Sequence, residues 1–257
     1  MIDSHCHLDV AAFDHDRDAV VARARAAGVR GILVPAIRPR TWPALRTLAR
    51  AIPELRVALG IHPQIIPELD ATERALDAET LAAELGDAVA VGECGLDGDT
   101  GDRELQETLF RMQIRAARLA KRPLVIHVLR AHDVAPRILD EERAREVGGV
   151  LHSYSGGADL VDVYRKLGLA FSFAGPITYP NARKPVAAAR AIPDDLLLAE
   201  TDAPDQAPAS HRGERSEPAF VGDVIAGLAA ARGVDPGALA ALTAANARRI
   251  FDHGGGW

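Results

Sequence analysis

The sequence predicts an α/β fold in which eight parallel strands and their helices close into a single (β/α)8 barrel, a TIM barrel. Strand-like apolar segments alternate with helical patterns along 257 residues, about the length of one such domain. Five of these segments end on a His, Glu or Asp side chain, which is where barrel enzymes carry their chemistry. These side chains come from the first and eighth segments as well as from the middle, and a closed barrel places those two segments side by side.

The predicted elements run in a regular order from strand to helix. Apolar runs predict strands at residues 2–8, 31–36, 56–62, 88–93, 123–127, 148–152, 169–175 and 195–202. Amphipathic patterns predict helices at residues 14–27, 43–51, 73–85, 103–121, 132–146, 159–167, 181–191, 217–232 and 236–251. Residues 203–217 form the longest predicted loop and follow the eighth strand, where barrels place active-site loops. No GxGxxG pattern follows an early strand, which makes an open, doubly wound sheet the weaker interpretation.

The composition is that of a globular protein, with 48% hydrophobic and 26% charged residues. Residues 1–253 are expected to form one domain, and residues 254–257 a flexible tail. No run of about 18 apolar residues is present, so no membrane span is predicted, and the chain starts without a basic and apolar leader. Cys6 and Cys94 are the only cysteines, and two free thiols favour a reducing, cytoplasmic location.

The charge balance limits the possible partners. A net charge of -6 and a pI near 5.8 argue against a protein that grips long duplex DNA, because such proteins carry a basic stripe. If the substrate is nucleic acid, we expect a short contact at an end or a single-stranded stretch, with metal ions supplying much of the positive charge. Nothing in the sequence indicates an obligate protein partner.

Six side chains at the predicted strand ends have the chemistry of metal ligands. His5 and His7 are two residues apart, and residues i and i+2 of a strand share a face, so both can bind one ion. The full set is His5, His7, Glu93, His127, His152 and Asp202. Any one of these histidines alone is more simply interpreted as a hydrogen-bonded core residue. The whole set at one barrel mouth favours a metal centre.

Six ligands suit two ions better than one. The expected arrangement places His5, His7 and Asp202 on the first ion, His127 and His152 on the second, and Glu93 as the bridge. Imidazole and carboxylate ligands together suit Zn²⁺ or Mn²⁺, and carboxylate-rich positions also accept Mg²⁺, so the identity of the ions stays open. Paired ions of this kind polarise a scissile bond and activate water, which predicts a hydrolase.

Short motifs occur along the chain in a fixed order. They are HCH at 5–7, GIHP at 60–63, GECGLD at 92–97, IH at 126–127, HSYSGG at 152–157, ETDAP at 200–204 and RGxxxEP at 212–218. In this order and spacing they resemble the TatD family of metal-dependent hydrolases over nearly the whole chain. The resemblance implies a barrel of the amidohydrolase type, a two-metal centre and, in several members, nuclease activity on DNA. It assigns the same six ligands, with Glu93 at the place where related amidohydrolases often carry a carboxylated lysine.

The sequence departs from the usual family pattern at three places near the predicted mouth. Gln64 stands where typical members have a second histidine, in GIHPQ rather than GIHPH. Residues 98–102 replace the aromatic residues that usually follow GLD. Leu129 occupies the usual position of an arginine, and Arg130 comes one residue later. The metal ligands therefore transfer from the family, and the substrate does not.

Four further residues are weaker candidates for the site. His62 ends the third predicted strand, and Arg130 and Arg212 lie in loops after later strands, so these three could contact substrate phosphates. A rim hydrogen bond for His62 and plain solvent exposure for the arginines are the alternatives. Glu200 lies two residues before Asp202 on the same strand face, which suggests that it orients a ligand histidine or a bound water.

The expected activity is hydrolysis of phosphodiester bonds in DNA, with short oligonucleotides or single-stranded ends favoured over long duplex. Asp202 would act as the general base, and Glu93 would hold both ions in place. A two-metal hydrolase of a small phosphate ester, lactone or amide is the alternative enzyme. A non-catalytic metal-binding scaffold is the alternative from another class. A hydrolysis screen over DNA, RNA and small esters separates the three.

Overall fold

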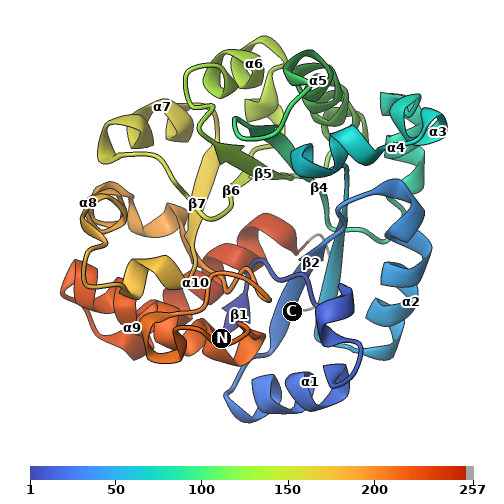
Figure 1. Cartoon of the computed structure of the whole chain (residues 1–257). Helices are drawn as coiled ribbons and strands as arrows, with labels where there is room; N and C mark the ends of the chain where they lie inside the picture. Colours follow the sequence, from blue (N-terminus) through green and yellow to red (C-terminus); the bar gives the residue numbers. More distant parts are fainter. Residues whose placement is uncertain (253–257) are drawn as a thin grey trace.

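A ring of eight parallel strands lies at the centre of the computed structural model, with helices around it (Figure 1). The structure describes residues 1–252. Each strand pairs with the next one along the chain, from β1 to β8. The strands are β1 Ile2–Asp3, β2 Gly31–Pro35, β3 Leu55–Leu59, β4 Ala90–Asp97, β5 Leu124–Leu129, β6 Gly149–Leu151, β7 Leu169–Phe173 and β8 Leu197–Ala199. The prediction of a (β/α)8 barrel is confirmed.

Helices follow the strands along the chain. The α-helices are α1 Arg17–Ala26, α2 Trp42–Ala51, α3 Ala71–Arg74, α4 Ala78–Glu84, α5 Arg103–Ala120, α6 Ala135–Glu141, α7 Val161–Lys166, α8 Arg183–Ala191, α9 Val221–Arg232 and α10 Pro236–Phe251. Short 3-10 helices are η1 Ala11–Phe13, η2 Pro39–Thr41, η3 Pro63–Glu68, η4 Ala144–Glu146, η5 Ala158–Leu160, η6 Gly175–Thr178, η7 Asp194–Leu196, η8 Ala209–His211 and η9 Pro218–Phe220. Most of them lie at the starts of α-helices or in the loops that surround the barrel mouth.

The single helix predicted over residues 73–85 is wrong, because the structure has two short helices there, α3 and α4. Asp70 precedes α3, and its side chain accepts a hydrogen bond from the backbone N–H of Glu73. Asp77 precedes α4 and accepts from the backbone N–H of Thr80 in the same way. A side chain that caps a helix start satisfies backbone donors that have no partner within the helix. The second cap therefore begins a new helix inside the predicted span.

The first strand is also shorter than predicted. It ends at Asp3, so the prediction of a strand over residues 2–8 is wrong beyond that residue. His5 and His7 lie in the irregular segment that follows β1. The imidazoles of His5 and His7 nevertheless converge, with their Nε2 atoms 3.2 Å apart.

The first and last strands are joined at this segment. The backbone N–H of Asp202 donates to the carbonyl oxygen of His5 at 2.9 Å. One carboxyl oxygen of Asp3 accepts from the backbone N–H of Thr201 at 2.9 Å, and the other lies 2.5 Å from the hydroxyl of Thr201. Burial raises the pKa of Asp3 to about 8. These hydrogen bonds hold the N-terminal segment against the end of β8 and so close the barrel.

Helix α10 covers the amino-terminal end of the barrel. Its residues Ala244, Ala247 and Phe251 are three and four positions apart, which places them on one helix face. They pack against one buried apolar residue from each strand: Ile2, Leu33, Ala58, Ala90, Val125, Val150, Ala170 and Leu198. Figure 1 shows α10, in red, inside the outline of the strand ring. The floor of the barrel is therefore sealed, and the chemistry gathers at the opposite end, where the strands finish.

Among residues 1–252, no single helix is long and apolar enough to cross a membrane. Residues 218–232 and 236–251 meet the length and composition requirement only when taken together, and a bend of 110° separates them. That residues 1–253 form one domain stays a prediction. Its last residue and the predicted tail at 254–257 lie outside the described residues.

Candidate metal centre

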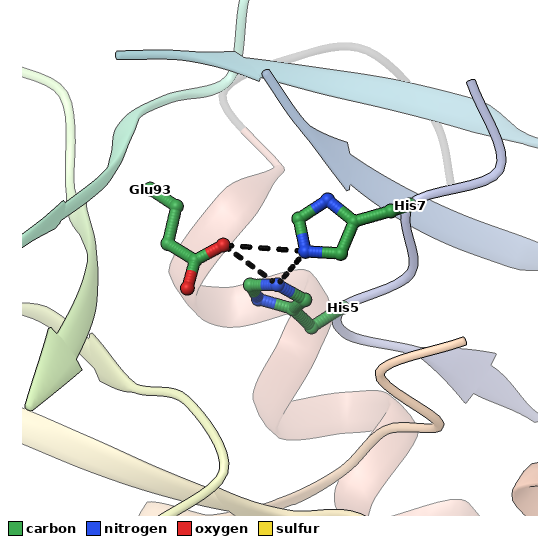
Figure 2. Close-up of side chains that lie close together, drawn as sticks. All are labelled: His5, His7 and Glu93. Atoms are coloured by element: carbon green, nitrogen blue, oxygen red, sulfur yellow. Dashed lines mark hydrogen bonds and ion pairs between the residues drawn. The ribbon is translucent and has the colours of Figure 1, made fainter. Parts of the chain in front are cut away.

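Glu93 lies among the predicted ligands, with its two carboxylate oxygens facing two different groups of nitrogen atoms. Its Oε2 lies 3.2 Å from His5 Nε2 and 3.3 Å from His7 Nε2, and these two nitrogens are 3.2 Å apart (Figure 2). The two rings converge, as their spacing of two residues predicts. Asp202 Oδ1 lies on the same side, 3.6 Å from His5 Nε2 and 3.7 Å from His7 Nε2.

The Oε1 atom of Glu93 faces the second group. His152 Nε2 lies 2.6 Å from this oxygen and His127 Nδ1 lies 3.1 Å from it. These two nitrogens are 3.1 Å apart. The structure thus brings the six predicted side chains into one cluster, with His5 and His7 nearest to one oxygen of Glu93 and His127 and His152 nearest to the other. The two sides touch, because the rings of His5 and His152 stack with centroids 4.0 Å apart. The assignment of the six side chains to two ions stays a prediction.

One buried oxygen at the centre of this cluster lacks the partner that a buried polar atom normally has. Glu93 Oε2, which faces His5 Nε2 and His7 Nε2, makes no hydrogen bond within the described residues. Ligand atoms about 2.1 Å from a tetrahedral ion lie about 3.4 Å apart. The facing atoms of His5, His7 and Glu93 are 3.2 to 3.3 Å apart, and the three residues form a group with metal-site spacing. The donor set therefore fits a divalent cation.

A bulge in β4 places Glu93. Val91 pairs with Leu124 on β5, but Cys94, three residues further along β4, pairs with Ile126, only two residues further along β5. The extra residue on β4 bends the strand locally and re-aims the side chains within the bulge. Glu93 lies in this bulge and is fully buried at the barrel axis.

Two glycines allow β4 to approach β5 at this place. Gly92 has φ +132° and Gly95 has φ +140°, conformations that other residue types rarely adopt. A Cβ on Gly95 would lie 1.9 Å from the carbonyl oxygen of His127, and one on Gly92 would lie 2.3 Å from that of Val125. The close approach brings Glu93 on one strand within reach of His127 on the next.

Asp97 is a member of the site that the sequence analysis missed. Its Oδ2 lies 3.1 Å from His127 Nε2 and accepts a hydrogen bond from the side-chain amide of Gln64 at 2.8 Å. These bonds, with that of His127 the strongest, hold the pKa of Asp97 well below its usual range. On the other side of the ring, His127 Nδ1 faces Glu93 Oε1 at 3.1 Å. Burial opposes the protonation of His127, but the hydrogen bonds with Asp97 and Glu93 outweigh burial, and the pKa of His127 is raised. Residues 93, 95 and 97 share one strand face, and this signal could have identified Asp97 had β4 been extended beyond Glu93.

Glu200 faces His152, as the sequence analysis expected for a residue that orients a ligand histidine. Its Oε1 lies 3.5 Å from His152 Nδ1 and accepts from the backbone N–H of Ser153 at 2.5 Å. Its other oxygen accepts a hydrogen bond from the hydroxyl of Ser172. Burial opposes the ionisation of Glu200, but the hydrogen bond and charge of His152 outweigh burial, and the pKa of Glu200 is lowered.

His62 lies in the cluster rather than at its outer rim. Its Nε2 is 2.9 Å from Glu93 Oε1, and its Nδ1 accepts from the backbone N–H of Gln64 at 3.0 Å. A ring nitrogen that accepts a hydrogen bond carries no proton, which assigns the proton to Nε2. Burial lowers the pKa of His62 to about 4, so the ring is neutral at pH 7. Although its nitrogen is near enough to Glu93 and His127 for metal binding, this tautomer makes His62 a hydrogen-bond donor.

The two arginines suggested as phosphate contacts lie away from the cluster. Arg130 Nη1 lies 2.6 Å from Asp99 Oδ1, and 72% of its side chain is exposed. The guanidinium of Arg212 lies over the ring of Tyr179, 5.5 Å from its centroid. Neither arginine lines the cavity above the metal-site residues. Any contact of theirs with a substrate is therefore made outside that cavity.

A cavity of about 530 Å³ opens over the cluster. Its walls include ligand candidates from both sides of Glu93 and, from the loops, Gln64, Ser153, Asp205 and Gln206. Within residues 1–252, no Lys or Arg lines it. The volume is in the range of sites for small molecules or for one end of a longer substrate.

Several known proteins are similar to this chain in sequence or in structure. A family model described as TatD related DNase matches residues 2–252. The uncharacterized metal-dependent hydrolase YabD of Bacillus subtilis is 34% identical over 253 residues, which cover 98% of each chain. The 3'-5' ssDNA/RNA exonuclease TatD of Citrobacter rodentium is 33% identical over 260 residues, covering 98% of this chain and 97% of its own. The crystal structure of the TatD homolog YjjV of Escherichia coli K12 matches with a TM-score of 0.90 and 31% identity over 98% of both chains.

Proposed function

Since the chain belongs to the TatD family and is a metal-dependent hydrolase, we propose that it hydrolyses phosphodiester bonds in DNA, acting on single-stranded ends or short oligonucleotides. The observation that carries the proposal is the position of Glu93. Its two oxygens face two separate groups of nitrogens at the floor of an open cavity. Paired metal sites of this kind are typical of enzymes that cleave phosphate esters by in-line displacement.

We assign two divalent ions to this centre, and Mg²⁺, Mn²⁺ and Zn²⁺ all suit the donor set. The proposed ligands are His5, His7 and Asp202 for one ion, His127 and His152 for the other, and Glu93 for both. Bound ions of this type polarise the scissile phosphate and lower the pKa of water. Glu93 is fully buried in the bulge of β4, with one carboxylate oxygen facing each group of ligands.

Asp202 is the proposed general base. Its Oδ2 receives a hydrogen bond from the side-chain amide of Gln206. Its Oδ1 faces His5 and His7, and it is the oxygen available to accept a proton from the attacking water. His62 is a neutral donor whose Nε2–H faces Glu93 Oε1 at 2.9 Å, and we propose that it donates to a phosphate oxygen of the bound substrate.

The charge of the mouth favours a short contact with nucleic acid. Asp205 is exposed and lines the cavity, and Arg130 is already paired with Asp99. Arg130 and Arg212 lie outside the cavity, so we propose that they contact only phosphates that flank the cleaved bond. A long duplex would bring many phosphates against an acidic protein, whereas a single-stranded end brings few. The naming of the relative from Citrobacter rodentium as an ssDNA/RNA exonuclease supports the same preference.

A metal-dependent hydrolysis screen tests the proposal. Protein stripped of metal and reloaded with Mg²⁺, Mn²⁺ or Zn²⁺ is offered end-labelled single-stranded DNA, the matching duplex, RNA and small phosphate esters. We expect the single strand to be shortened from an end, faster than the duplex, with all activity lost in EDTA. Asp202→Asn protein purified in parallel controls for contaminating nucleases. If small esters were hydrolysed and the oligonucleotides were not, the proposal of a DNA substrate would be wrong, but the proposed metal centre would still be supported.

A second candidate is hydrolysis of a small phosphate ester, lactone or amide at the same centre. It is favoured by one observation, the lack of Lys and Arg among the described residues that line the cavity. Polyanionic substrates usually meet such cations close to the reacting bond. A non-catalytic scaffold has no comparable observation in its favour, and a metal-loaded protein inert across the whole screen would support it.

We also propose that the protein works in the cytoplasm without an obligate protein partner. Cys6 and Cys94 are buried and form no disulfide, which fits a reducing compartment. Fractionation of cells followed by detection of the protein, together with its mass in solution, tests both statements.

A further inference from the structure

Gln206 joins two strand ends at the mouth of the cavity. Its Nε2 donates a hydrogen bond to Asp202 Oδ2, and its Oε1 accepts one from the hydroxyl of Ser153 at 2.8 Å. An ionised carboxylate can only accept, so the NH2 end of the amide must face Asp202, and the hydroxyl fills the other end. Both ends of the amide are therefore used, although the residue lines an open cavity.

The backbone is unusual at all three residues of this chain of hydrogen bonds. Ser153, Asp202 and Gln206 have φ values of 40°, 52° and 53°. Residues other than glycine seldom occupy this left-handed region, and they persist there only where the surroundings hold them. Such residues cluster at functional sites. Their coincidence around one carboxylate indicates that the structure holds this carboxylate in a particular orientation.

The support for Gln206 is rigid. Gly175, just after β7, lies so close that a Cβ there would be 1.9 Å from the carbonyl oxygen of Gln206. The hydroxyl of Tyr179 donates to the carbonyl oxygen of Ala207 at 2.8 Å. A group that orients another side chain must itself be fixed, and these contacts fix the loop at Gln206 and at the residue that follows it.

We infer that Gln206 is a positioning residue that determines which oxygen of Asp202 faces the metal centre. With Oδ2 bound to the amide, Oδ1 is turned toward His5 and His7. An amide suits this task because it donates a hydrogen bond without a positive charge that would compete with a cation for the carboxylate. The inference rests on the proposed role of Asp202 as a metal ligand.

The role of Ser153 in positioning Gln206 can be tested separately from that of Gln206 itself. Its hydroxyl holds Oε1 of Gln206, while its backbone N–H donates to Glu200. The hydroxyl therefore acts on Asp202 only through the amide. Removing the hydroxyl after the amide has been removed should have no further effect.

Calorimetric titration of the metal-stripped protein with Mn²⁺ tests the inference without any substrate. In Gln206→Leu, which keeps the bulk and loses both polar ends, we expect one Mn²⁺ to bind about 10-fold more weakly. In Ser153→Ala we expect a smaller loss, and the double variant should match Gln206→Leu. On whichever substrate the screen identifies, kcat should fall with KM unchanged. The melting temperature in EDTA should stay within about 2 °C of wild type, because the site is polar and lines an open cavity.

Ser210→Ala is the matched control, since Ser210 is an exposed residue of the same loop and lies outside the cavity over the metal centre. Unchanged Mn²⁺ affinity in Gln206→Leu would overturn the inference. Losses that add up in the double variant would overturn it as well, because the hydroxyl would then act independently of the amide. If Gln206→Leu does not fold, Ser153→Ala alone decides by the same titration. A wild-type protein that cleaves no DNA while Gln206→Leu weakens Mn²⁺ binding would reject the proposed substrate and support this inference.

Discussion

The two sides of Glu93 differ in how their histidines are held. On the Oε1 side, carboxylates lie behind both imidazoles. His127 Nε2 is 3.1 Å from Asp97, and His152 Nδ1 is 3.5 Å from Glu200. The first of these carboxylates is itself bound by an amide, and the second by a hydroxyl and a backbone N–H.

On the Oε2 side, no carboxylate lies behind the histidines. The Nδ1 atoms of His5, His7 and His152 are all buried without a hydrogen bond to residues 1–252, but only that of His152 has a carboxylate at 3.5 Å. Asp202 completes this side and is held by Gln206. The backbone segments that carry these ligands come from opposite ends of the chain and are joined where β8 meets the segment after β1.

We infer from this difference that the protein itself orients the histidines on the Oε1 side, whereas those on the Oε2 side have less support without a metal ion. A carboxylate behind a ligand imidazole fixes its tautomer and its orientation and raises its basicity. We therefore expect a tighter ion on the Oε1 side and a more easily exchanged ion on the Oε2 side. The following variants test this comparison, in order of decreasing expected effect.

Removal of the unsupported histidines should have the largest effect. In His5→Ala/His7→Ala, we expect one metal equivalent to be lost, because Asp202 and a shared Glu93 cannot hold an ion alone. Hydrolysis should fall to the background rate, while the ion on the Oε1 side stays. Metal per chain from elemental analysis, together with activity in the screen, measures both. Full metal content and unchanged activity in this variant would contradict the ligand assignment.

Asp202→Asn should come next. The variant keeps the shape of the side chain and loses the base, so we expect the chemical step to slow by about 10²-fold or more in single-turnover experiments. The fold and the Oε1-side ion should be retained, as judged by circular dichroism and metal analysis. Near-normal divalent-dependent hydrolysis in this variant would show that Asp202 is not the general base.

Loss of support on the Oε1 side should have an intermediate effect. In Asp97→Asn, the acceptor for His127 Nε2 is weakened, and we expect the tighter ion to bind about 10- to 100-fold more weakly. Asp99→Asn, an exposed neighbour paired with Arg130, is the matched control. A competition titration with a chelator measures the affinity of the protein for each ion. If Asp97→Asn lowered the affinity for the exchangeable ion and left the affinity for the tighter ion unchanged, the proposed difference between the two sides would be wrong.

The smallest expected effect concerns the loop that carries His62 and Gln64. Arg38 Nε donates to Glu73 at 3.0 Å, both side chains are buried, and Arg38 also binds the carbonyl of Glu68 in η3. The hydrogen bond from Arg38 lowers the pKa of Glu73 to about 2, below its ordinary value of 4.5. Its contribution to folding is therefore present above about pH 4.5 and is lost as the pH falls through 2, by about 3 kcal/mol at most.

Urea unfolding from pH 7 to pH 2 measures this contribution. In Arg38→Met/Glu73→Leu, apolar groups replace the pair, which is often nearly neutral for stability at pH 7. We expect the free energy of unfolding of the wild type to decrease more steeply than that of the double variant below pH 4.5. Parallel profiles for the two proteins would contradict the assigned pKa. Hydrolysis at pH 7 should be unchanged in the double variant.

Much of this fold could be predicted because each barrel strand has a recognisable pattern in its own short stretch of sequence. Each strand is a short apolar run, and the ligand candidates sit where the runs stop, so the fold and the grouping of His5 with Asp202 followed from the pattern. Element boundaries were less predictable. Helices α3 and α4 divide where Asp77 caps a new helix, and a cap competes with helix propensity over a single turn.

The residues that escaped prediction did so for different reasons. Asp97 was missed because the predicted strand ended at Glu93, whereas β4 continues to Asp97 and its alternation places residues 93, 95 and 97 on one face. Gln206 reaches Asp202 through a loop with left-handed residues, which are set by contacts with other loops. Arg130 pairs with Asp99 in the structure, and its contact with substrate phosphates stays a proposal.

The contacts of helix α10 determine how late in translation the barrel can finish folding. Phe251 and its neighbours on that helix pack against residues as early as Ile2, and His5 likewise needs Asp202. During translation the early partners leave the ribosome first and stay unpaired until almost the whole chain has emerged. Contacts over such sequence separations form slowly and leave apolar surface open to other chains. The nascent protein should therefore depend on chaperones late in synthesis, and a message truncated before α10 should yield aggregates.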